Sequence, residues 1–311
     1  MMTSFRLDAD TAIYQIVEFD GPTHDAQWML PAATPEILAA NADWLDGAFW
    51  MPNTNRLVFS YQLWVVKTRD AIVLVDSGCG NHKRRVSPYQ DMINTPVLDW
   101  LESIGAPADK VTHVLHTHLH SDHVGWNTRL LDGRWEPTFP NATYYMPRED
   151  YAMFTQHMAT KMGPEMYDQV IADSVVPVID AGLTKFIAAG DEVAGFQAIA
   201  APGHTPGQLI YAFRHGGDTM LFSGDVFHSP LQVPYPHINS RWCEQSRIAC
   251  ETRSAVLEQA AASDRVRIMP AHVQGVDGWR VARTSSGFAI GFDRKPTGNS
   301  RAAERSVHHD I

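Results

Sequence analysis

The apolar positions near the start of the chain predict β-strands. Thr11–Phe19 is rich in β-branched and aromatic residues, and we expect Gly21-Pro22 to end this strand. Leu57–Lys67 and Ala71–Val75 are two further apolar runs, separated by the polar residues 68–70. The pattern therefore predicts a hairpin of two strands that ends just before Asp76.

Predicted helices and strands alternate through the rest of the chain. The spacing of apolar residues predicts an amphipathic helix over Met92–Ile104, a strand over Val111–His116 and a short helix over Val124–Leu131. Longer helices are expected over Arg148–His157 and Cys243–Ala262. Short apolar runs bounded by turn residues predict strands at Val176–Ile179, Phe186–Ala189, Val193–Ala200, Gln208–Phe213, Thr219–Ser223, Arg267–Pro270 and Phe288–Phe292.

Three segments allow more than one interpretation. Residues 24–56 are rich in tryptophan and lack a long regular period, so they form an irregular arm packed on the core or line a substrate pocket. Residues 151–175 are predicted to be helical and are rich in methionine, which suits core packing, a mobile lid or a dimer contact. Residues 293–311 are polar and are expected to form a flexible tail that includes His308 and His309.

Composition and charge narrow the class of partner. The 311 residues are 44% hydrophobic, which is enough for a substantial core and for one or two domains. The formal net charge of −10 argues against nucleic acid or an anionic membrane as the main partner, since both prefer a basic surface. We therefore expect a small-molecule substrate, and we leave a homodimer open.

Cysteine usage and the apolar runs indicate the compartment. Cys79, Cys243 and Cys250 are too few, and odd in number, for a disulfide framework, so a reducing, cytoplasmic location is expected. The first ten residues lack the apolar stretch of a secretory signal, and no run approaches the roughly 18 apolar residues of a membrane span.

The strongest chemical signal is the run His118-Leu119-His120-Ser121-Asp122-His123. Four of its side chains carry imidazole nitrogens or carboxylate oxygens, which are good ligands for zinc and neighbouring first-row metals. The run follows a predicted strand, so it lies on a loop where side chains can converge. His118 and His120 can reach one ion, whereas Asp122 and His123 point the other way and can reach a second.

Further motifs occur in order around this run. Ile72–Gly78 precedes it, and it is followed by Pro202–Gly207 with His204, by Ser223–Asp225, and by Pro270–His272. Together these motifs resemble those of the metallo-β-lactamase superfamily over about two thirds of the chain. The resemblance implies an α/β fold, an αββα sandwich of two mixed sheets face to face with helices outside, as a single domain over residues 1–292.

The resemblance also implies a dinuclear metal site with two Zn²⁺ ions, or other divalent first-row metals. A water held between two cations loses a proton near neutral pH and becomes the nucleophile. A histidine at position 120 favours zinc-type hydrolysis, because di-iron oxygen-reducing relatives usually carry a glutamate there. Asp122 is expected to act also as general acid and base. By motif position, one ion takes His118, His120 and His204, the other takes Asp122, His123 and His272, and Asp225 bridges both.

The residue three positions after Asp225 bears on the substrate. His228 matches the methyl-parathion-hydrolase-like pattern, whereas quorum-sensing lactonases tend to carry a tyrosine there. We expect His228 to orient substrate or to donate a hydrogen bond to a developing oxyanion. The resemblance thus implies hydrolysis of a lactone or aryl ester, with phosphotriesterase activity as an option. The alternatives are a thioester hydrolase resembling glyoxalase II and an iron-dependent sulfur dioxygenase.

Some residues near the motifs are expected to support the metal loop without binding metal. Asp76 should hydrogen-bond the loop, as outer carboxylates do for ligating histidines. His113 and His116 precede the loop on its strand and are expected to face the core or to lie behind the ligands. Cys79 is expected to be a buried free thiol.

Overall fold

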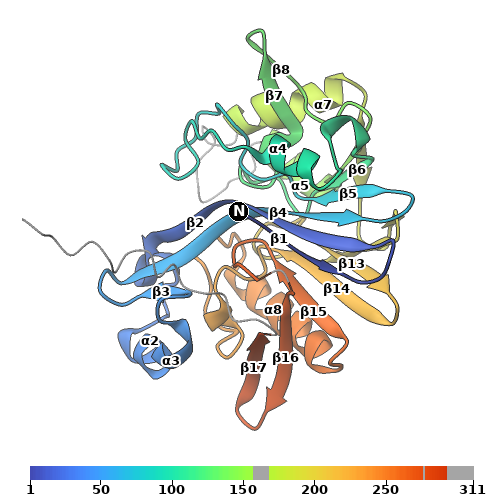
Figure 1. Ribbon diagram of the computed structural model, residues 1–311. Coiled ribbons are helices and arrows are strands. Elements are labelled where there is room, and N and C mark those ends of the chain that lie inside the picture. Colours follow the sequence, from blue (N-terminus) through green and yellow to red (C-terminus); the bar gives the residue numbers. More distant parts are fainter. Residues whose placement is uncertain (157–167, 276, 293–311) are drawn as a thin grey trace, which may run out of the picture.

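Two mixed β-sheets lie against each other between outer helices in the computed structural model, which describes residues 1–156, 168–275 and 277–292 (Figure 1). The first sheet has the strand order β1-β2-β4-β5-β6-β9-β10, with β3 paired to β4. Strands β5, β6, β9 and β10 are parallel. The bounds are β1 Met2–Arg6, β2 Ala12–Asp25, β3 Trp50–Met51, β4 Arg56–Lys67, β5 Ile72–Val75, β6 His113–Leu115, β9 Thr143–Pro147 and β10 Thr184–Ile187.

The second sheet follows the chain from β11 to β17 in sequence order. All its neighbouring strands are antiparallel except β14 and β15, which are parallel. The bounds are β11 Glu192–Val193, β12 Phe196–Ala200, β13 Leu209–His215, β14 Asp218–Gly224, β15 Val266–Pro270, β16 Trp279–Thr284 and β17 Gly287–Phe292.

Alternation along the central strands gives each sheet two apolar faces. In β4, Trp64 packs between the two sheets, whereas Leu63 and Val65 pack on the helix side. In β13, Tyr211 lies between the sheets and Ile210 points to the opposite face. Side chains alternate along a strand, and a buried apolar side chain of this size contributes about 1.5–3 kcal/mol, so both faces of each sheet need a cover.

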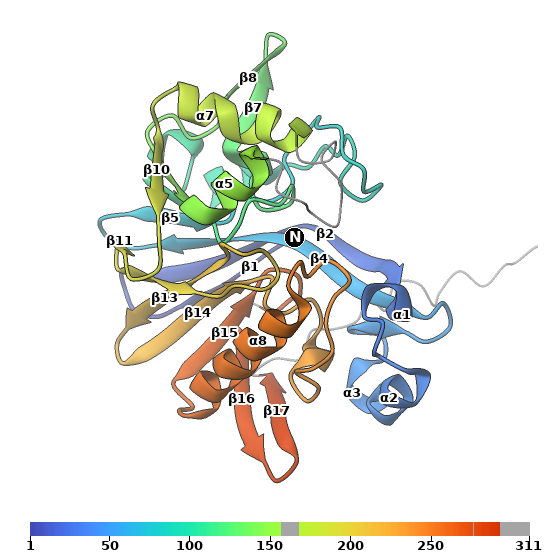
Figure 2. The ribbon, with the colours of Figure 1, turned by 180° about the vertical axis from the view of Figure 1, so that it is seen from behind.

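Helices provide that cover on the two outer sides (Figure 2). Val97 and Leu101 of α4 pack on the first sheet, and Leu257 of α8 packs on the second. The predicted αββα sandwich is therefore confirmed. Helices in the described part of the chain include α1 Ala26–Met29, α2 Pro35–Ala40, α3 Ala42–Leu45, α4 Val97–Ser103, α5 Arg148–Thr155, α7 Val176–Asp180 and α8 Ser246–Ala261.

The helix predicted over Val124–Leu131 is wrong for most of its length. One turn of 3-10 helix, Gly125–Asn127, leads into strand β7 (Thr128–Leu131), which pairs with β8 (Arg134–Pro137). Asp132 and Gly133 join them with φ values of +49° and +77°. An Asp-Gly pair in this conformation is a strong hairpin signal, and it outweighs the helical spacing.

Two predicted strands are also corrected. Val176–Ile179 belongs to helix α7, which carries Pro177 in its first turn, where proline is tolerated. Val193–Ala200 is divided into β11 and β12 by a turn at Ala194 and Gly195, whose φ values are +50° and +83°. Strand β16 was not predicted.

The observed ends of two elements, β2 and α4, differ from the predicted ends. Gly21-Pro22 does not end β2, because shifts in the register against β4 let the strand continue to Asp25. The helix predicted from Met92 begins only at Val97, since Pro96 precedes it.

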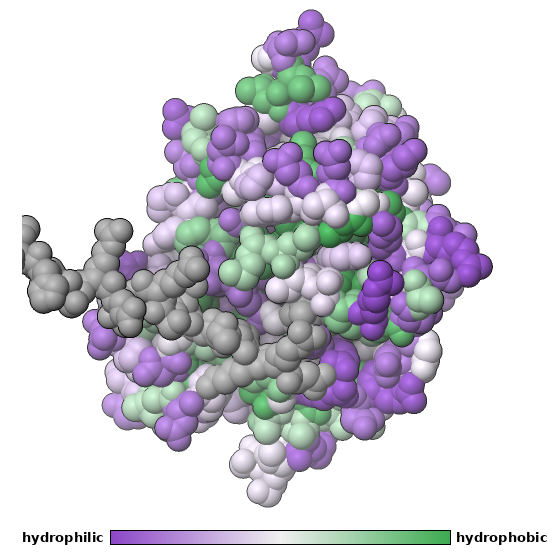
Figure 3. Space-filling view, in the orientation of Figure 1, coloured by the Kyte–Doolittle hydropathy of each residue, from purple (hydrophilic) through white to green (hydrophobic). Residues whose placement is uncertain are grey.

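Parts of two predicted segments lie outside the described residues, namely 157–167 and the tail 293–311 with His308 and His309. The lid and the tail therefore stay predictions. Within the described part, Ile171–Val175 is a π-helix. Among the described helices, none combines the length and apolar character that a membrane crossing requires. The face in Figure 3 shows hydrophilic side chains interspersed with smaller hydrophobic areas.

Candidate metal centre

The ends of strands from both sheets bring the seven predicted ligands together. The histidine run follows β6 in the first sheet, whereas Asp225 and His272 follow β14 and β15 in the second. Because β14 and β15 are parallel neighbours, the residues after their carboxyl ends meet at the same edge. His204 lies on the loop between β12 and β13. The seven side chains form two sets, in each of which the potential ligand atoms lie within 4.8 Å of one another.

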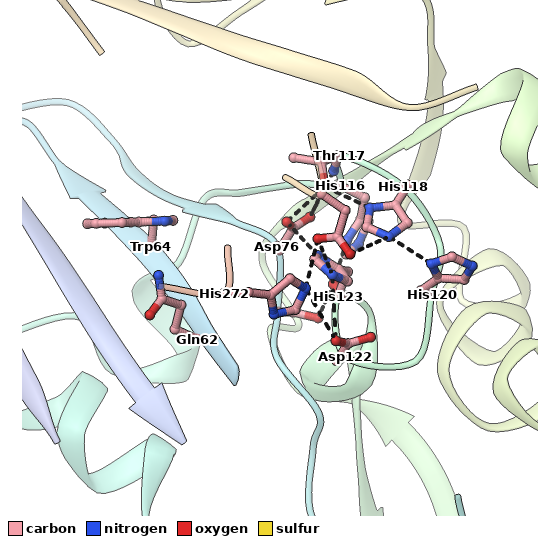
Figure 4. A network of polar contacts seen from close by, with 12 residues as sticks. Gln62, Trp64, Asp76, His116, Thr117, His118, His120, Asp122, His123 and His272 are labelled. Carbon is pink, nitrogen blue, oxygen red and sulfur yellow. Dashed lines mark hydrogen bonds and ion pairs between the residues drawn. The ribbon is translucent and has the colours of Figure 1, made fainter. Parts of the chain in front are cut away.

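Three histidines of the first set direct ring nitrogens at one point. His120 Nδ1 lies 3.0 Å from His118 Nε2 (Figure 4). It lies 2.8 Å from His204 Nε2. Burial lowers the pKa of His120 to about 4 and lowers the pKa values of His118 and His204 well below the usual range. All three rings are therefore neutral and each has a lone pair. Converging lone pairs suit a cation better than mutual hydrogen bonds.

The second set combines one carboxylate with two imidazoles. Asp122 Oδ2 lies 3.8 Å from His123 Nε2 and 3.7 Å from His272 Nε2. The Asp122 side chain is 12% exposed, whereas both histidines are buried. This is a donor set that zinc and its first-row neighbours accept.

Asp225 lies between the two sets and presents one oxygen to each. Its Oδ2 is 3.2 Å from His204 Nε2, and its Oδ1 is 3.1 Å from His123 Nε2 and 2.8 Å from His272 Nε2. Burial opposes ionisation, but His272 and His123 hold the pKa of Asp225 well below its usual range. Oδ1 and His123 Nε2 are buried without a hydrogen-bond partner among the described residues, and a cation between them would satisfy both.

Neighbouring groups orient the rings of the ligands. Asp76 accepts hydrogen bonds from the Thr117 amide and from His123 Nδ1, both at 2.8 Å, as predicted (Figure 4). It does so with φ +57°, a left-handed conformation that is rare for a buried residue other than glycine. His272 Nδ1 lies 2.9 Å from the Ser60 carbonyl oxygen. These contacts hold Nδ1 of His123 and of His272, so that Nε2 of each ring faces the other predicted metal ligands.

Two of the supporting predictions can be placed directly. His116 is fully buried behind the loop, with Nδ1 3.1 Å from the His123 carbonyl oxygen. Cys79 is a buried free thiol. Neither side chain belongs to the two ligand sets.

Asp150 joins the two loops that carry the first set, and no sequence motif singled it out. Its carboxylate accepts hydrogen bonds from the Leu119 amide at 3.2 Å, the Thr205 hydroxyl at 2.9 Å and the Gly207 amide at 2.8 Å. Leu119 lies between His118 and His120, and Thr205 follows His204. Asp150 is therefore a positioning residue for three of the predicted ligands, His118, His120 and His204.

Glycines beside two ligands allow the loops to approach other elements. A Cβ at Gly224, before Asp225, would lie 2.6 Å from Thr117 Oγ1. A Cβ at Gly203, before His204, would lie 2.3 Å from the Ala249 backbone nitrogen. Both glycines have positive φ, so a larger residue would be strained and would displace the ligand that follows it.

The family pattern of the metallo-β-lactamase superfamily matches residues 57–272. The chain belongs to this superfamily. The matched region contains all seven residues of the two ligand sets.

Curated proteins of related sequence match only part of the chain. YobT of Bacillus subtilis is 24% identical over 171 residues, 55% of this chain and 63% of that protein. A hydroxyacylglutathione hydrolase of a Synechocystis species is 34% identical over 138 residues, 42% of this chain and 40% of the relative. The chain thus matches less than two thirds of the length of either relative.

Solved structures match the superfamily fold over most of the chain. The hydrolase AbOPH superposes with a TM-score of 0.76 at 20% identity, over 93% of this chain and 96% of its own. AidC, a dizinc quorum-quenching lactonase, superposes with a TM-score of 0.76 at 19% identity, over 94% and 97%. At this identity the likeness establishes the fold.

The metal centre of this superfamily member opens into a cavity of about 750 Å³. His120, Asp122, His204, Asp225 and His272 line its floor. The arm over residues 24–56 contributes to the wall, as one of its two interpretations proposed. The rest of the wall comes from four further segments, through residues such as Phe59, Arg85, Val170 and Trp242.

His228 lies behind the Asp225 carboxylate and is not among the residues that line the cavity. Its Nε2 is 3.2 Å from Asp225 Oδ2, and its side chain is fully buried. Burial lowers its pKa, so the ring is neutral. The ring lies beside those of His204, Trp242 and His272. This place suits a residue that positions Asp225, and contact with substrate stays a prediction.

Tyr61 of strand β4 lines the cavity, although the sequence did not single it out. Burial raises its pKa, and the nearby charge of Asp122 adds to the effect, so the hydroxyl stays protonated. A neutral tyrosine beside Asp122 is a hydrogen-bond donor at the floor of the cavity.

Proposed function

We propose that the protein is a dinuclear metal-dependent hydrolase that cleaves a lactone or an aryl ester, with phosphotriesters as further substrates. The observation that carries this proposal is the position of the Asp225 carboxylate at the floor of the cavity. One of its oxygens faces His204 of the first ligand set, and the other faces His123 of the second. Membership of the superfamily supports it, as does a fold like those of AbOPH and the lactonase AidC.

The donor set fits two divalent ions of the first row, and zinc is the ion that we propose. When bound, such ions supply Lewis acidity toward a carbonyl or phosphoryl oxygen and a water of nearly neutral pKa. The residues that would hold them are His118, His120 and His204 for one ion, and Asp122, His123 and His272 for the other, with Asp225 between them.

Asp122 is the proposed group for proton transfer. It lines the cavity and is the most exposed of the carboxylates at the centre. In this position it accepts the proton of the attacking water and returns it to the leaving oxygen. Tyr61 is placed to donate a hydrogen bond to substrate from the same floor.

The wall of the cavity suits a flat or apolar substrate group. Trp28, Phe59 and Trp242 form adjacent ring contacts along it, with centroids 6.1 Å apart for the two tryptophans and 5.8 Å for Phe59 and Trp242. Ligand pockets are usually apolar with a few placed polar groups. An aryl or acyl group fits such a wall.

A thioester hydrolase of the glyoxalase II type is the second candidate. It is favoured by the partial sequence match to hydroxyacylglutathione hydrolases, which covers 42% of this chain. The arginines of the cavity wall would suit an anionic thiol leaving group. The two candidates differ in the bond that is cleaved.

Initial hydrolysis rates of the zinc-loaded protein separate the candidates. We would compare γ- and δ-lactones, aryl esters, a thioester and a phosphotriester at equal concentrations. A clear preference for lactones or aryl esters is expected. A preference for the thioester would transfer the assignment to the second candidate, and metal analysis that finds iron without zinc would contradict a zinc hydrolase.

A further inference from the structure

Two arginines at the cavity wall have no carboxylate partner in the described part of the chain. The cavity is lined by four arginines, two of which already pair with a carboxylate. Arg85 pairs with Asp173 at 2.7 Å, and Arg84 pairs with Asp91 at 3.3 Å. Arg56 and Arg241 form no such ion pair, although both are exposed to the cavity.

Both guanidinium groups are held in place by neutral contacts. Arg241 Nε donates to the Trp28 carbonyl oxygen at 2.8 Å, and its guanidinium lies 5.1 Å from the centre of the Trp28 ring. Arg56 donates to the Thr23 carbonyl oxygen and lies 3.4 Å from the Tyr89 hydroxyl. These contacts leave guanidinium nitrogens free to bind an anion, and the side chains need little further ordering to do so.

None of the acidic residues that the structure describes along this wall forms an ion pair with Arg56 or Arg241. Asp25 is the N-cap of α1, and its oxygens accept hydrogen bonds from the Gln27 and Trp28 amides and from Asn55. Asp122 and Asp225 belong to the metal centre. The mouth therefore carries two guanidinium charges against the one carboxylate of Asp25, beside a set of aromatic ring faces, although the whole chain carries a net charge of −10.

Aromatic rings connect the two arginines. His24 stacks on Trp28 with centroids 5.0 Å apart, and it meets Tyr89 and Trp242 edge to face. Burial and the neighbouring charge of Arg56 lower the pKa of His24 to about 4, so it adds no charge of its own. A flat apolar group can lie against these rings while an anionic end reaches a guanidinium.

We propose that the substrate carries an anionic group, such as a carboxylate, which Arg56 and Arg241 bind at the cavity mouth while the scissile bond lies at the metal centre. This inference rests on the proposed hydrolase function, and it narrows the substrate class to anionic esters or lactones. A carboxylate and a phosphate share the required chemistry, since a guanidinium can bind either through two hydrogen bonds.

Matched pairs of esters test the proposal. Para-nitrophenyl butyrate and mono-para-nitrophenyl succinate differ in the charge of the acyl group, and phenyl acetate and carboxyphenyl acetate differ in the charge of the leaving group. A third para-nitrophenyl ester, whose acyl chain ends in a phosphate in place of the succinate carboxylate, shows which of the two anions the subsite prefers. The readout is the ratio of kcat/KM for the anionic ester to that for its neutral partner.

We expect the zinc-loaded protein to prefer the anionic member of at least one pair. Arg56→Gln and Arg241→Gln should each lower the ratio by about ten-fold, mainly through KM, because a charge-assisted hydrogen bond is lost. Raising the salt from about 0.1 M to 1 M should lower the ratio as well. Arg84→Gln is the matched control, since Asp91 already balances that cation.

The possible outcomes distinguish a failure of the anionic subsite from a failure of the proposed hydrolase function. Hydrolysis of both members at similar rates, or a ratio that neither substitution changes, would overturn the anionic subsite and leave the hydrolase standing. No hydrolysis of any ester by protein that retains its metal would overturn both. An equal loss of the ratio in Arg84→Gln would also refute the role of the two unpaired arginines.

Discussion

Asp150→Ala would show how far the metal centre depends on a carboxylate that belongs to neither ligand set. The substitution removes the acceptor for three buried donors, the Leu119 amide, the Thr205 hydroxyl and the Gly207 amide. Two of these donors lie next to predicted ligands in sequence. The expected result is a loss of stability together with a loss of metal affinity.

The magnitude follows from two opposing contributions. Each donor left without a partner in the interior costs about 1–3 kcal/mol. Burial raises the pKa of Asp150 to about 7, so removing this carboxylate also relieves an unfavourable burial of charge. We expect a net loss of about 3 kcal/mol in the free energy of unfolding, and a loss of metal affinity of about 10- to 100-fold.

Two assays separate these effects. Urea unfolding of the metal-free protein reports the loss of loop contacts alone, and competition with a chromophoric chelator reports the affinity of the loaded protein. Asp150→Asn retains an acceptor oxygen and should lose less on both measures, which guards against a variant that simply fails to fold. Unchanged unfolding and affinity in Asp150→Ala would refute the positioning role.

The same group predicts a pH dependence in the metal-free protein. Its folded-state pKa of about 7 lies above its ordinary value of 3.8, so the folded state holds a proton that the unfolded state has released. This contribution is complete below about pH 4 and is lost as pH rises through 7. The free energy of unfolding should fall over that window, and Asp150→Asn should flatten the slope.

Four other substitutions test the remaining roles. Asp122→Asn should nearly abolish turnover and leave the fold intact, and near-normal rates would remove Asp122 from proton transfer. His120→Ala should lower the metal content by about one ion of the two, and an unchanged content by elemental analysis would contradict the first ligand set. His228→Ala should lower kcat with the metal retained, whereas an unaffected rate on every good substrate would leave it structural. Tyr61→Phe should lower kcat about ten-fold or more, as loss of one positioned donor does, and an unchanged kcat would exclude the donor role.

Contiguous motifs explain why the ligand sets could be predicted. His118, His120 and His123 lie within six residues, and His204, Asp225 and His272 each lie within a short motif at a strand end. Each motif is short and contiguous, so a match to the family motifs was enough to identify its ligand residue. These residues make up the two sets that the structure brings together. Apolar runs bounded by turn residues likewise predicted the core strands, such as β4 and β13, within a few residues.

The residues that the prediction missed have no local signal. Asp150 lies in the first turn of an ordinary helix, and only the approach of two distant loops gives it three donors. Arg56 and Arg241 are separated by most of the chain, and an exposed arginine is unremarkable in sequence. Their significance depends on which carboxylates lie nearby, which only the tertiary structure determines.

The direction of a side chain is the remaining limit on sequence reasoning at this site. His228 was correctly placed three residues after Asp225, but spacing along a loop does not say which side of the carboxylate the ring takes. The His228 amide donates to Gln232 Oε1 at 2.7 Å, within a capped turn that follows β14, and the ring is thereby held behind Asp225. Tyr61, which comes from the other sheet, takes the cavity side instead. A hydrogen-bond donor for substrate should therefore be sought on β4 as well as after Asp225.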